Sequence, residues 1–232
     1  MPIQDPQTNV LVVCAGMNEP SNSELLAENF MTGMKSIDTL HVQAVKLREK
    51  NIEHFTLAFY DPKKDQGKDF QDIQHSIEQA KGVVIVTPIW NFSVPAHLKN
   101  LIDRMGSFCL DSATHSKGTL GGKPFYLVFT GGSGNFVWNT VMENSTSHVR
   151  EAIKYFGGTV IGTHFEEHCV NMDKSFGLVL DKRPEALEAA KKKGAEFGAI
   201  VKNFATTGAL PASNKAKSLF YGIAQKVVKK LT

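Results

Sequence analysis

Short apolar segments rich in β-branched residues alternate along this chain with longer segments whose apolar residues recur at helical spacing. Such alternation is typical of βαβ units around a parallel sheet. Five strands are predicted, at Asn9 to Cys14, His41 to Leu47, Gly82 to Thr87, Pro124 to Thr130 and Thr159 to Thr163. Five helices are predicted, at Asn22 to Lys35, Asp69 to Ala80, Pro95 to Met105, Asn139 to Phe156 and Pro184 to Phe204. The segment from Phe55 to Phe59 is interpreted as an extension of the second strand or as a separate strand piece.

The first, third and fourth strands are almost continuous apolar runs, which indicates that helices cover both faces of the sheet. The expected fold class is therefore α/β, a doubly wound five-stranded parallel sheet in the order 2-1-3-4-5 with helices on both faces. In this arrangement ligands bind beyond the carboxyl ends of the strands, where the strand order reverses. The ligand-binding residues are therefore expected in the loops after the first, third and fourth strands.

A change in composition near the C-terminus divides the chain into one α/β domain, residues 1–205, and a C-terminal segment, residues 206–232. The Gly/Pro/Ala/Ser-rich stretch from Thr206 to Ser213 is the expected linker. After it, apolar residues at helical spacing beside lysines predict a basic amphipathic helix: Leu219, Phe220, Ile223, Val227, Val228 and Leu231. Two placements stay open, packing on the domain or on a second subunit, and weak contact with an anionic membrane surface.

Composition narrows the possible functions. Five of the 26 lysines and arginines lie within residues 213–232, which hold no acid, so the rest of the chain carries 21 basic and 23 acidic residues. The basic balance is therefore a property of the C-terminal segment, and no nucleic-acid partner is expected. No segment is long enough for the core of a signal peptide or for a bilayer span.

The three cysteines form neither a disulfide framework nor a zinc-ligand pattern, so a reducing, cytoplasmic setting is expected. His164 and His168 lack the glutamate of an HExxH motif, and no metal site is expected. Cys14, before a predicted helix, is interpreted as a small buried hydrophobic residue rather than as a redox-sensing thiol of lowered pKa.

The loop after the first strand leads directly into a predicted helix. The unpaired N–H groups and the dipole at a helix N-terminus favour a phosphate, and the hydroxyls of Ser21 and Ser23 can add donors. The loop has neither the GxGxxG nor the GxxxxGK[ST] pattern. A hydroxyl-rich loop without lysine suits a monophosphate such as that of FMN. The alternative is that Ser21 or Asn22 only caps the helix.

The other two loops suit a flat ring. After the third strand, Thr87 to Pro95 holds two prolines with apolar and aromatic residues between them, which could lie against the face and edge of a ring. Alternatively, Trp90 and Phe92 are core or dimer-contact aromatics. The fourth strand ends in Thr130-Gly131-Gly132-Ser133-Gly134-Asn135, where glycines permit close backbone approach and consecutive N–H groups could donate to ring carbonyls.

In combination these loops resemble those of the NAD(P)H-dependent FMN reductase and quinone reductase superfamily, whose fold is flavodoxin-like. The stretch from Pro88 to Ala96, with Leu98-Lys99 and Asp103-Arg104, resembles the flavin-ring loop and following helix of that group. Thr130 to Gly134 is similar to the DT-diaphorase and azoreductase branch. The resemblance extends from about Asn9 to Thr163.

The resemblance implies a non-covalently bound FMN and a homodimer with its active sites at the subunit interface. It implies these cofactor contacts: Met17, Ser21, Asn22 and Ser23 for the phosphate, and Pro88, Ile89, Trp90, Asn91, Phe92, Thr130, Gly131, Gly132 and Gly134 for the ring. The chain departs from DT-diaphorase after Gly134, where the sequence Asn135 to Trp138 lacks the tyrosine and following histidine of that enzyme.

The expected function is that of an FMN-dependent NAD(P)H oxidoreductase. It would pass hydride from NADH or NADPH through FMN to a small acceptor such as a quinone, a flavin or an azo compound. The flavin carries the chemistry, so no catalytic side chain is assigned. Arg104, Lys117 and Lys123 are possible nucleotide contacts. The alternatives are a flavodoxin-type electron carrier and a non-catalytic flavodoxin-like binding protein.

Overall fold

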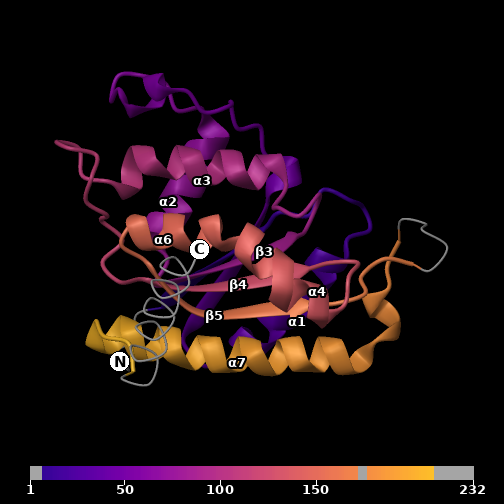
Figure 1. Ribbon diagram of the computed structural model, residues 1–232. Helices are drawn as coiled ribbons and strands as arrows, with labels where there is room; N and C mark the ends of the chain where they lie inside the picture. Colours follow the sequence, from indigo (N-terminus) through magenta and orange to yellow (C-terminus); the bar gives the residue numbers. More distant parts are fainter. Residues whose placement is uncertain (1–6, 172–176, 212–232) are drawn as a thin grey trace, which may run out of the picture.

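The sheet has five parallel strands. The structure, a computed structural model, describes residues 7–171 and 177–211. Its strands are β1 (Thr8–Cys14), β2 (Leu40–Lys46), β3 (Gly82–Pro88), β4 (Pro124–Thr130) and β5 (Thr159–Glu166). They lie in the order β2-β1-β3-β4-β5, and every neighbouring pair is parallel (Figure 1). The predicted fold class and strand order are confirmed.

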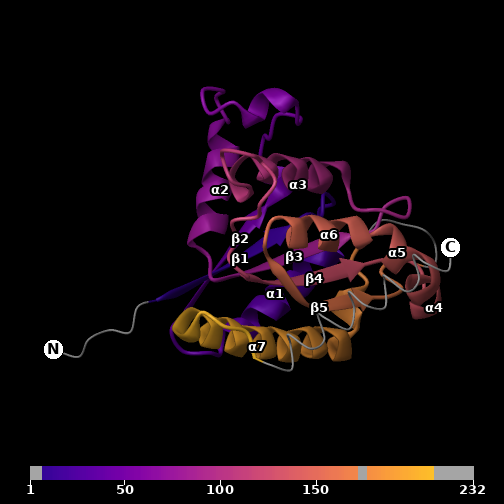
Figure 2. The ribbon, with the colours of Figure 1, turned by 60° about the vertical axis from the view of Figure 1, so that its left-hand side comes forward.

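Helices cover both faces of the sheet. They are α1 (Asn22–Lys35), α2 (Lys68–Gln79), α3 (Ala96–Cys109), α4 (Asn135–Val137), α5 (Glu143–Ser145), α6 (Ser147–Tyr155) and α7 (Pro184–Thr207). α1 and α7 lie on one face, and α2, α3 and α6 lie on the other (Figure 1, Figure 2). Side chains alternate accordingly along β1, where Leu11 and Val13 join one core layer and Val10 and Val12 join the other.

Two sequence-based boundaries need correction. The residues around Phe55 to Phe59 form no strand, because Leu57–Tyr60 is a short 3₁₀ helix. The helix predicted from Asn139 to Phe156 is divided into a π-helical turn at Trp138–Met142, then α5 and α6. The break falls at Ser145 and Thr146, whose hydroxyls both donate to the carbonyl oxygen of Met142, which also accepts from the N–H of Thr146. Such side-chain bonds to the backbone often bend a helix.

α1 and α7 pack at backbone contact distance. A Cβ added at Gly33 would lie 1.8 Å from the carbonyl oxygen of Lys191, and one added at Gly194 would lie 2.0 Å from that of Phe30. Only glycine fits at these two positions. The close contact fixes α1, the helix whose amino end borders the candidate site, against the long helix α7.

The predicted amphipathic helix lies outside the described residues, as do the last two residues of the predicted linker, Ala212 and Ser213. Within the described part, α7 continues to Thr207 rather than ending at Phe204. No helix in residues 7–171 and 177–211 is long and apolar enough to cross a membrane.

Candidate functional site

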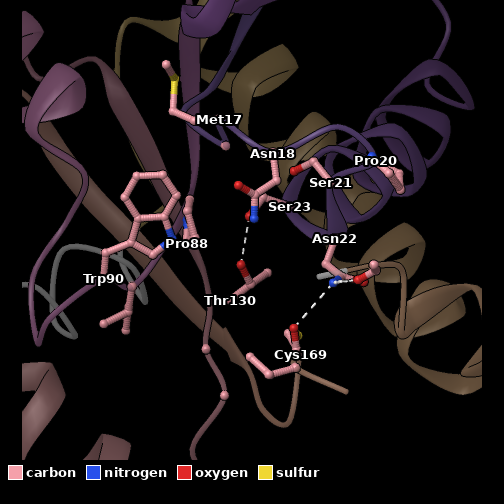
Figure 3. A pocket seen from close by; sticks show the side chains of 16 residues that line it. Met17, Asn18, Pro20, Ser21, Asn22, Ser23, Pro88, Trp90, Thr130 and Cys169 are labelled. Carbon is pink, nitrogen blue, oxygen red and sulfur yellow. Dashed lines mark hydrogen bonds between the residues drawn. The ribbon is translucent and has the colours of Figure 1, made fainter. Parts of the chain in front are cut away.

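A cavity of about 180 Å³ lies at the carboxyl ends of β1, β3 and β4 (Figure 3). Ten of the thirteen residues predicted from the sequence line it: Met17, Ser21, Asn22, Ser23, Pro88, Ile89, Trp90, Thr130, Gly131 and Gly132. The structure therefore brings all three predicted loops to one place. Asn91, Phe92 and Gly134 do not line the cavity.

The loop after β1 positions the amino end of α1 at the cavity. Ser21 is the N-cap, and its hydroxyl oxygen accepts from the backbone N–H of Glu24 at 3.3 Å. As acceptor in this bond, the hydroxyl keeps its own proton for another partner. Ser21 is thus both a helix cap and a cavity residue. The loop is tight, because a Cβ added at Gly16 would lie 2.5 Å from the Ser21 hydroxyl oxygen.

Two hydrogen bonds connect the three loops. The hydroxyls of Ser23 and Thr130 are 2.7 Å apart, which ties the first turn of α1 to the end of β4 (Figure 3). The N–H of Ile89 donates to the carbonyl oxygen of Thr130 at 2.8 Å. Thr130 therefore joins the loops after β1 and β3.

A tight turn explains why Asn91 and Phe92 lie away from the cavity. The N–H of Trp90 donates to the carbonyl oxygen of Ser93, and the N–H of Ser93 donates back to Trp90. The two residues between them have φ values of 49° and 65°, the left-handed region typical of a two-residue type I′ turn. Phe92 is 58% exposed and Trp90 is 39% exposed, so neither is a core aromatic.

The glycines after β4 provide space rather than unusual backbone angles. Neither Gly131 nor Gly132 is among the described glycines with positive φ. A Cβ at Gly131 would lie 2.7 Å from the Phe165 ring, and one at Gly132 would lie 2.9 Å from Val170. Larger residues would separate this loop from the segment that follows β5.

The sequence of residues 8–166 matches the family model of the NADPH-dependent FMN reductases. The chain belongs to this family. Membership confirms the predicted resemblance, the oxidoreductase class, FMN as cofactor and a nicotinamide nucleotide as reductant. It argues against a flavodoxin-type carrier and against a non-catalytic binding protein.

Two relatives share modest sequence identity with this family member. The chain is 25% identical over 149 residues to an FMN-dependent NADH:quinone oxidoreductase of Clostridium beijerinckii, covering 60% of this chain and 72% of the relative. It is 26% identical over 134 residues to a protein of the same name from Pseudoalteromonas atlantica, covering 51% of this chain and 66% of the relative.

Solved structures share the fold of this FMN reductase family member. An NAD(P)H:quinone oxidoreductase from Methanothermobacter marburgensis matches with a TM-score of 0.65 at 16% identity, over 82% of this chain and 97% of that one. An azoreductase from Bacillus anthracis matches with a TM-score of 0.60 at 20% identity, over 82% of this chain and 98% of that one. At these identities the matches support the fold alone.

Charges near the loop after β1 are balanced in this family member. The buried carboxylate of Glu24, in the first turn of α1, pairs with Lys46 at 2.9 Å and with Arg48. Both cations come from the end of β2 and the residues after it. An unpaired carboxylate here would repel an anion at the helix N-terminus, and the two cations remove that obstacle.

Two of the suggested nucleotide contacts are buried and engaged elsewhere. Arg104 is 0% exposed, lies 3.4 Å from the Phe59 ring centroid and donates to the carbonyl oxygens of Glu53 and Gln66, both at 2.8 Å. It fastens the long β2–α2 connection to α3. Lys123 is buried and donates to the carbonyl oxygens of Ile77 and Glu78 at the end of α2. Lys117 alone of the three is exposed.

Cys14 behaves as the buried hydrophobic residue that the sequence favours. It is 2% exposed, and burial, reinforced by nearby Glu24, raises the pKa of its thiol to about 12. A reactive thiol requires the opposite shift.

Sequence reasoning missed six residues that line the cavity: Gly16, Asn18, Pro20, Cys169, Val170 and Gly177. The first three lie inside the loop already singled out. The other three follow β5, which is the edge strand and carries no recognisable motif there. Among the described residues no group of three or more His, Cys, Asp and Glu side chains is placed to hold a metal.

Proposed function

We propose that FMN binds in this cavity and carries hydride from NADH or NADPH to a quinone or an azo compound. One observation carries the proposal, namely that loops from β1, β3 and β4 line one cavity at the amino end of a long helix. The names of the two relatives and of the azoreductase neighbour support the acceptor class.

The phosphate end of the site is assigned to the first turn of α1. The backbone N–H groups of Asn22 and Ser23 have no partner within the helix, because the first four N–H groups of any α-helix lack one. Together with the helix dipole they favour an anion at this point. The Ser21 hydroxyl adds a donor, and the ion pairs of Glu24 keep the neighbourhood from being negative.

The ring end is assigned to the loops after β3 and β4. Pro88, Ile89 and Trp90 offer an apolar edge, and Gly131 and Gly132 line the cavity beside it. The N–H of Gly131 already donates to the carbonyl oxygen of Glu166 at 3.0 Å, so the donor to the ring is assigned to Gly132. Bound FMN supplies the hydride-carrying chemistry, and these groups hold and orient it.

The assigned acceptor class is tested by turnover. The FMN-loaded protein is mixed with NADPH or NADH and either a water-soluble quinone or an azo dye, and consumption of both reactants is followed. Equal consumption of nucleotide and acceptor supports the proposal. Nucleotide consumption that stays at the rate without acceptor contradicts it.

We also propose a homodimer. Large apolar side chains gather around the cavity and the nearby helices α4 and α5: Met17, Trp90, Phe92, Phe136, Val141 and Val170 are all at least 39% exposed. Contiguous exposed apolar surface favours a protein partner. A molar mass of one chain in light scattering would contradict the homodimer.

The domain division and the cellular location are likewise proposals. Residues 1–205 are assigned to the flavin-binding domain and residues 206–232 to a C-terminal segment that packs on the protein rather than on a membrane. A cytoplasmic location is supported by three free cysteines, two of them fully buried. Liposome binding that is lost on deleting residues 213–232 would contradict the packing assignment.

A further inference from the structure

The outer wall of the cavity comes from described residues of the connection between β5 and α7. Cys169, Val170 and Gly177 line the cavity from this side. All three lie beyond residue 166, where the match to the family model ends. The wall is therefore a feature of this chain that the family model does not describe.

The side chain of Asn22 joins this wall to the amino end of α1. Its Nδ2 donates to the carbonyl oxygens of Cys169 at 3.3 Å and of Gly177 at 3.0 Å (Figure 3). Its Oδ1 accepts from the backbone N–H groups of Val179 at 2.8 Å and of Leu180 at 3.1 Å. A carboxamide offers two donor hydrogens and two acceptor lone pairs, so its hydrogen-bonding capacity is used in full.

The beginning of the same connection is held by other contacts. The N–H of Cys169 donates to the carbonyl oxygen of Gly131 at 2.8 Å, and Arg183 donates to the carbonyl oxygen of Glu167 at 2.7 Å. The first bond holds the connection to the glycine loop, on the ring side of the cavity, and the second joins the two ends of the connection to each other. Asn22 holds it on the phosphate side.

We propose that Asn22 is a positioning residue, which holds Cys169 and residues 177–180 in place as the part of the wall that retains the flavin. The inference rests on the proposed function, because it takes the cavity as the FMN site. The Asn22 side chain is not a phosphate ligand in this account, since both hydrogens of its amide are donated to backbone carbonyls. Only its backbone N–H faces the phosphate.

The two roles of Asn22 are separated by comparing FMN with riboflavin, which lacks the phosphate. If Asn22 were a phosphate ligand, Asn22→Ala would weaken the binding of FMN and leave the binding of riboflavin unchanged. If Asn22 holds the wall, the substitution weakens the binding of both flavins by the same factor. We expect the Kd of each to rise about tenfold, which corresponds to about 1.4 kcal/mol.

Hydrogen exchange in the flavin-free protein gives a second readout. The amide protons of Val179 and Leu180 should exchange faster in Asn22→Ala than in the wild type, because their acceptor is removed. Asn29→Ala is the matched control. Asn29 lies on the same helix, and its Nδ2 donates to the carbonyl oxygen of Leu25 within that helix. It should change neither the exchange nor the Kd values.

The proposal is overturned if Asn22→Ala weakens the binding of FMN alone, or if the amide protons of Val179 and Leu180 exchange as slowly as in the wild type. Should Asn22→Ala fail to fold, Asn22→Ser, with a residue well tolerated at helix starts, takes its place in both measurements. A wild-type protein that binds neither flavin would contradict the proposed function instead, and exchange of the two amides would still decide whether Asn22 holds the wall.

Discussion

Three neighbouring polar side chains in the loop after β1 have distinct roles, although the sequence alone suggests the same role for all three. Ser21, Asn22 and Ser23 stand in one short run, and each is a polar residue of the type that binds phosphate. In the structure the Ser21 hydroxyl accepts a hydrogen bond and can still donate one, whereas the Ser23 hydroxyl is hydrogen-bonded to that of Thr130. The Asn22 amide is hydrogen-bonded to the backbone of the wall. The partners that decide these roles are distant in the sequence, at residue 130 and at residues 169, 177, 179 and 180, so the local sequence does not predict them.

Ser21→Ala should therefore affect FMN and riboflavin differently, in contrast to Asn22→Ala. We expect the Kd of FMN to rise about tenfold, since a hydrogen bond to a charged group contributes about 1.5 kcal/mol or more. The Kd of riboflavin should stay unchanged. Loss of the helix cap should also lower the free energy of unfolding by about 1 kcal/mol.

Ser36→Ala is the control for this substitution. Ser36 lies at the other end of α1, where its hydroxyl donates to the carbonyl oxygen of Gly33, away from the cavity. Both Kd values should match the wild type. Equal weakening of FMN and riboflavin by Ser21→Ala would show that Ser21 acts only as a cap.

Among the elements, the strands and their order are predictable, whereas the connections are not. β1, β3 and β4 are each buried between two helical layers, and a strand buried on both faces is apolar almost throughout, so these strands can be predicted from their composition. The β2–α2 connection instead depends on the buried Arg104, which lies far along the chain on α3 and which the sequence suggests only as a possible nucleotide contact. The wall after β5 depends in the same way on Asn22.

The contact between α1 and α7 gives a prediction at the scale of elements. Gly33→Ala would place a methyl group against the backbone of Lys191, and we expect the free energy of unfolding to fall by about 3 kcal/mol. Gly198→Ala is the matched control in the same interface. Its added Cβ meets Leu40 and Ile37 side chains at 3.0 and 3.2 Å, which can adjust, while alanine favours the helix.

Chemical denaturation measures both variants. A loss in Gly33→Ala no larger than in Gly198→Ala would contradict the close backbone packing.

At the scale of the whole molecule, the raised pKa of the thiols makes the free energy of unfolding fall as the pH becomes alkaline. Burial raises the pKa of Cys14, Cys109 and Cys169 to about 12, above their ordinary value of 9.0. Between these values the unfolded chain loses thiol protons that the folded protein keeps. The free energy of unfolding should therefore fall as pH rises from 9 to 12, by about 1.4 kcal/mol per pH unit for each thiol.

The Cys14→Ala variant isolates one of these contributions from all other titrating groups. Its free energy of unfolding, measured by urea denaturation at several pH values, should decline less steeply than that of the wild type above pH 9. Identical slopes would show that the Cys14 thiol ionises in the folded protein, as a reactive cysteine would.

The visible absorbance of the FMN-loaded protein, recorded without air before and after NADPH or NADH is added, tests most directly whether this protein binds FMN and reduces it. We expect flavin bands that are shifted from those of free FMN and that bleach when the nucleotide is added, because we propose that the cavity binds FMN where a nicotinamide can reach it. Bound flavin whose bands persist with both nucleotides would contradict the reductase function. A protein that retains no FMN would contradict the assignment of the cavity.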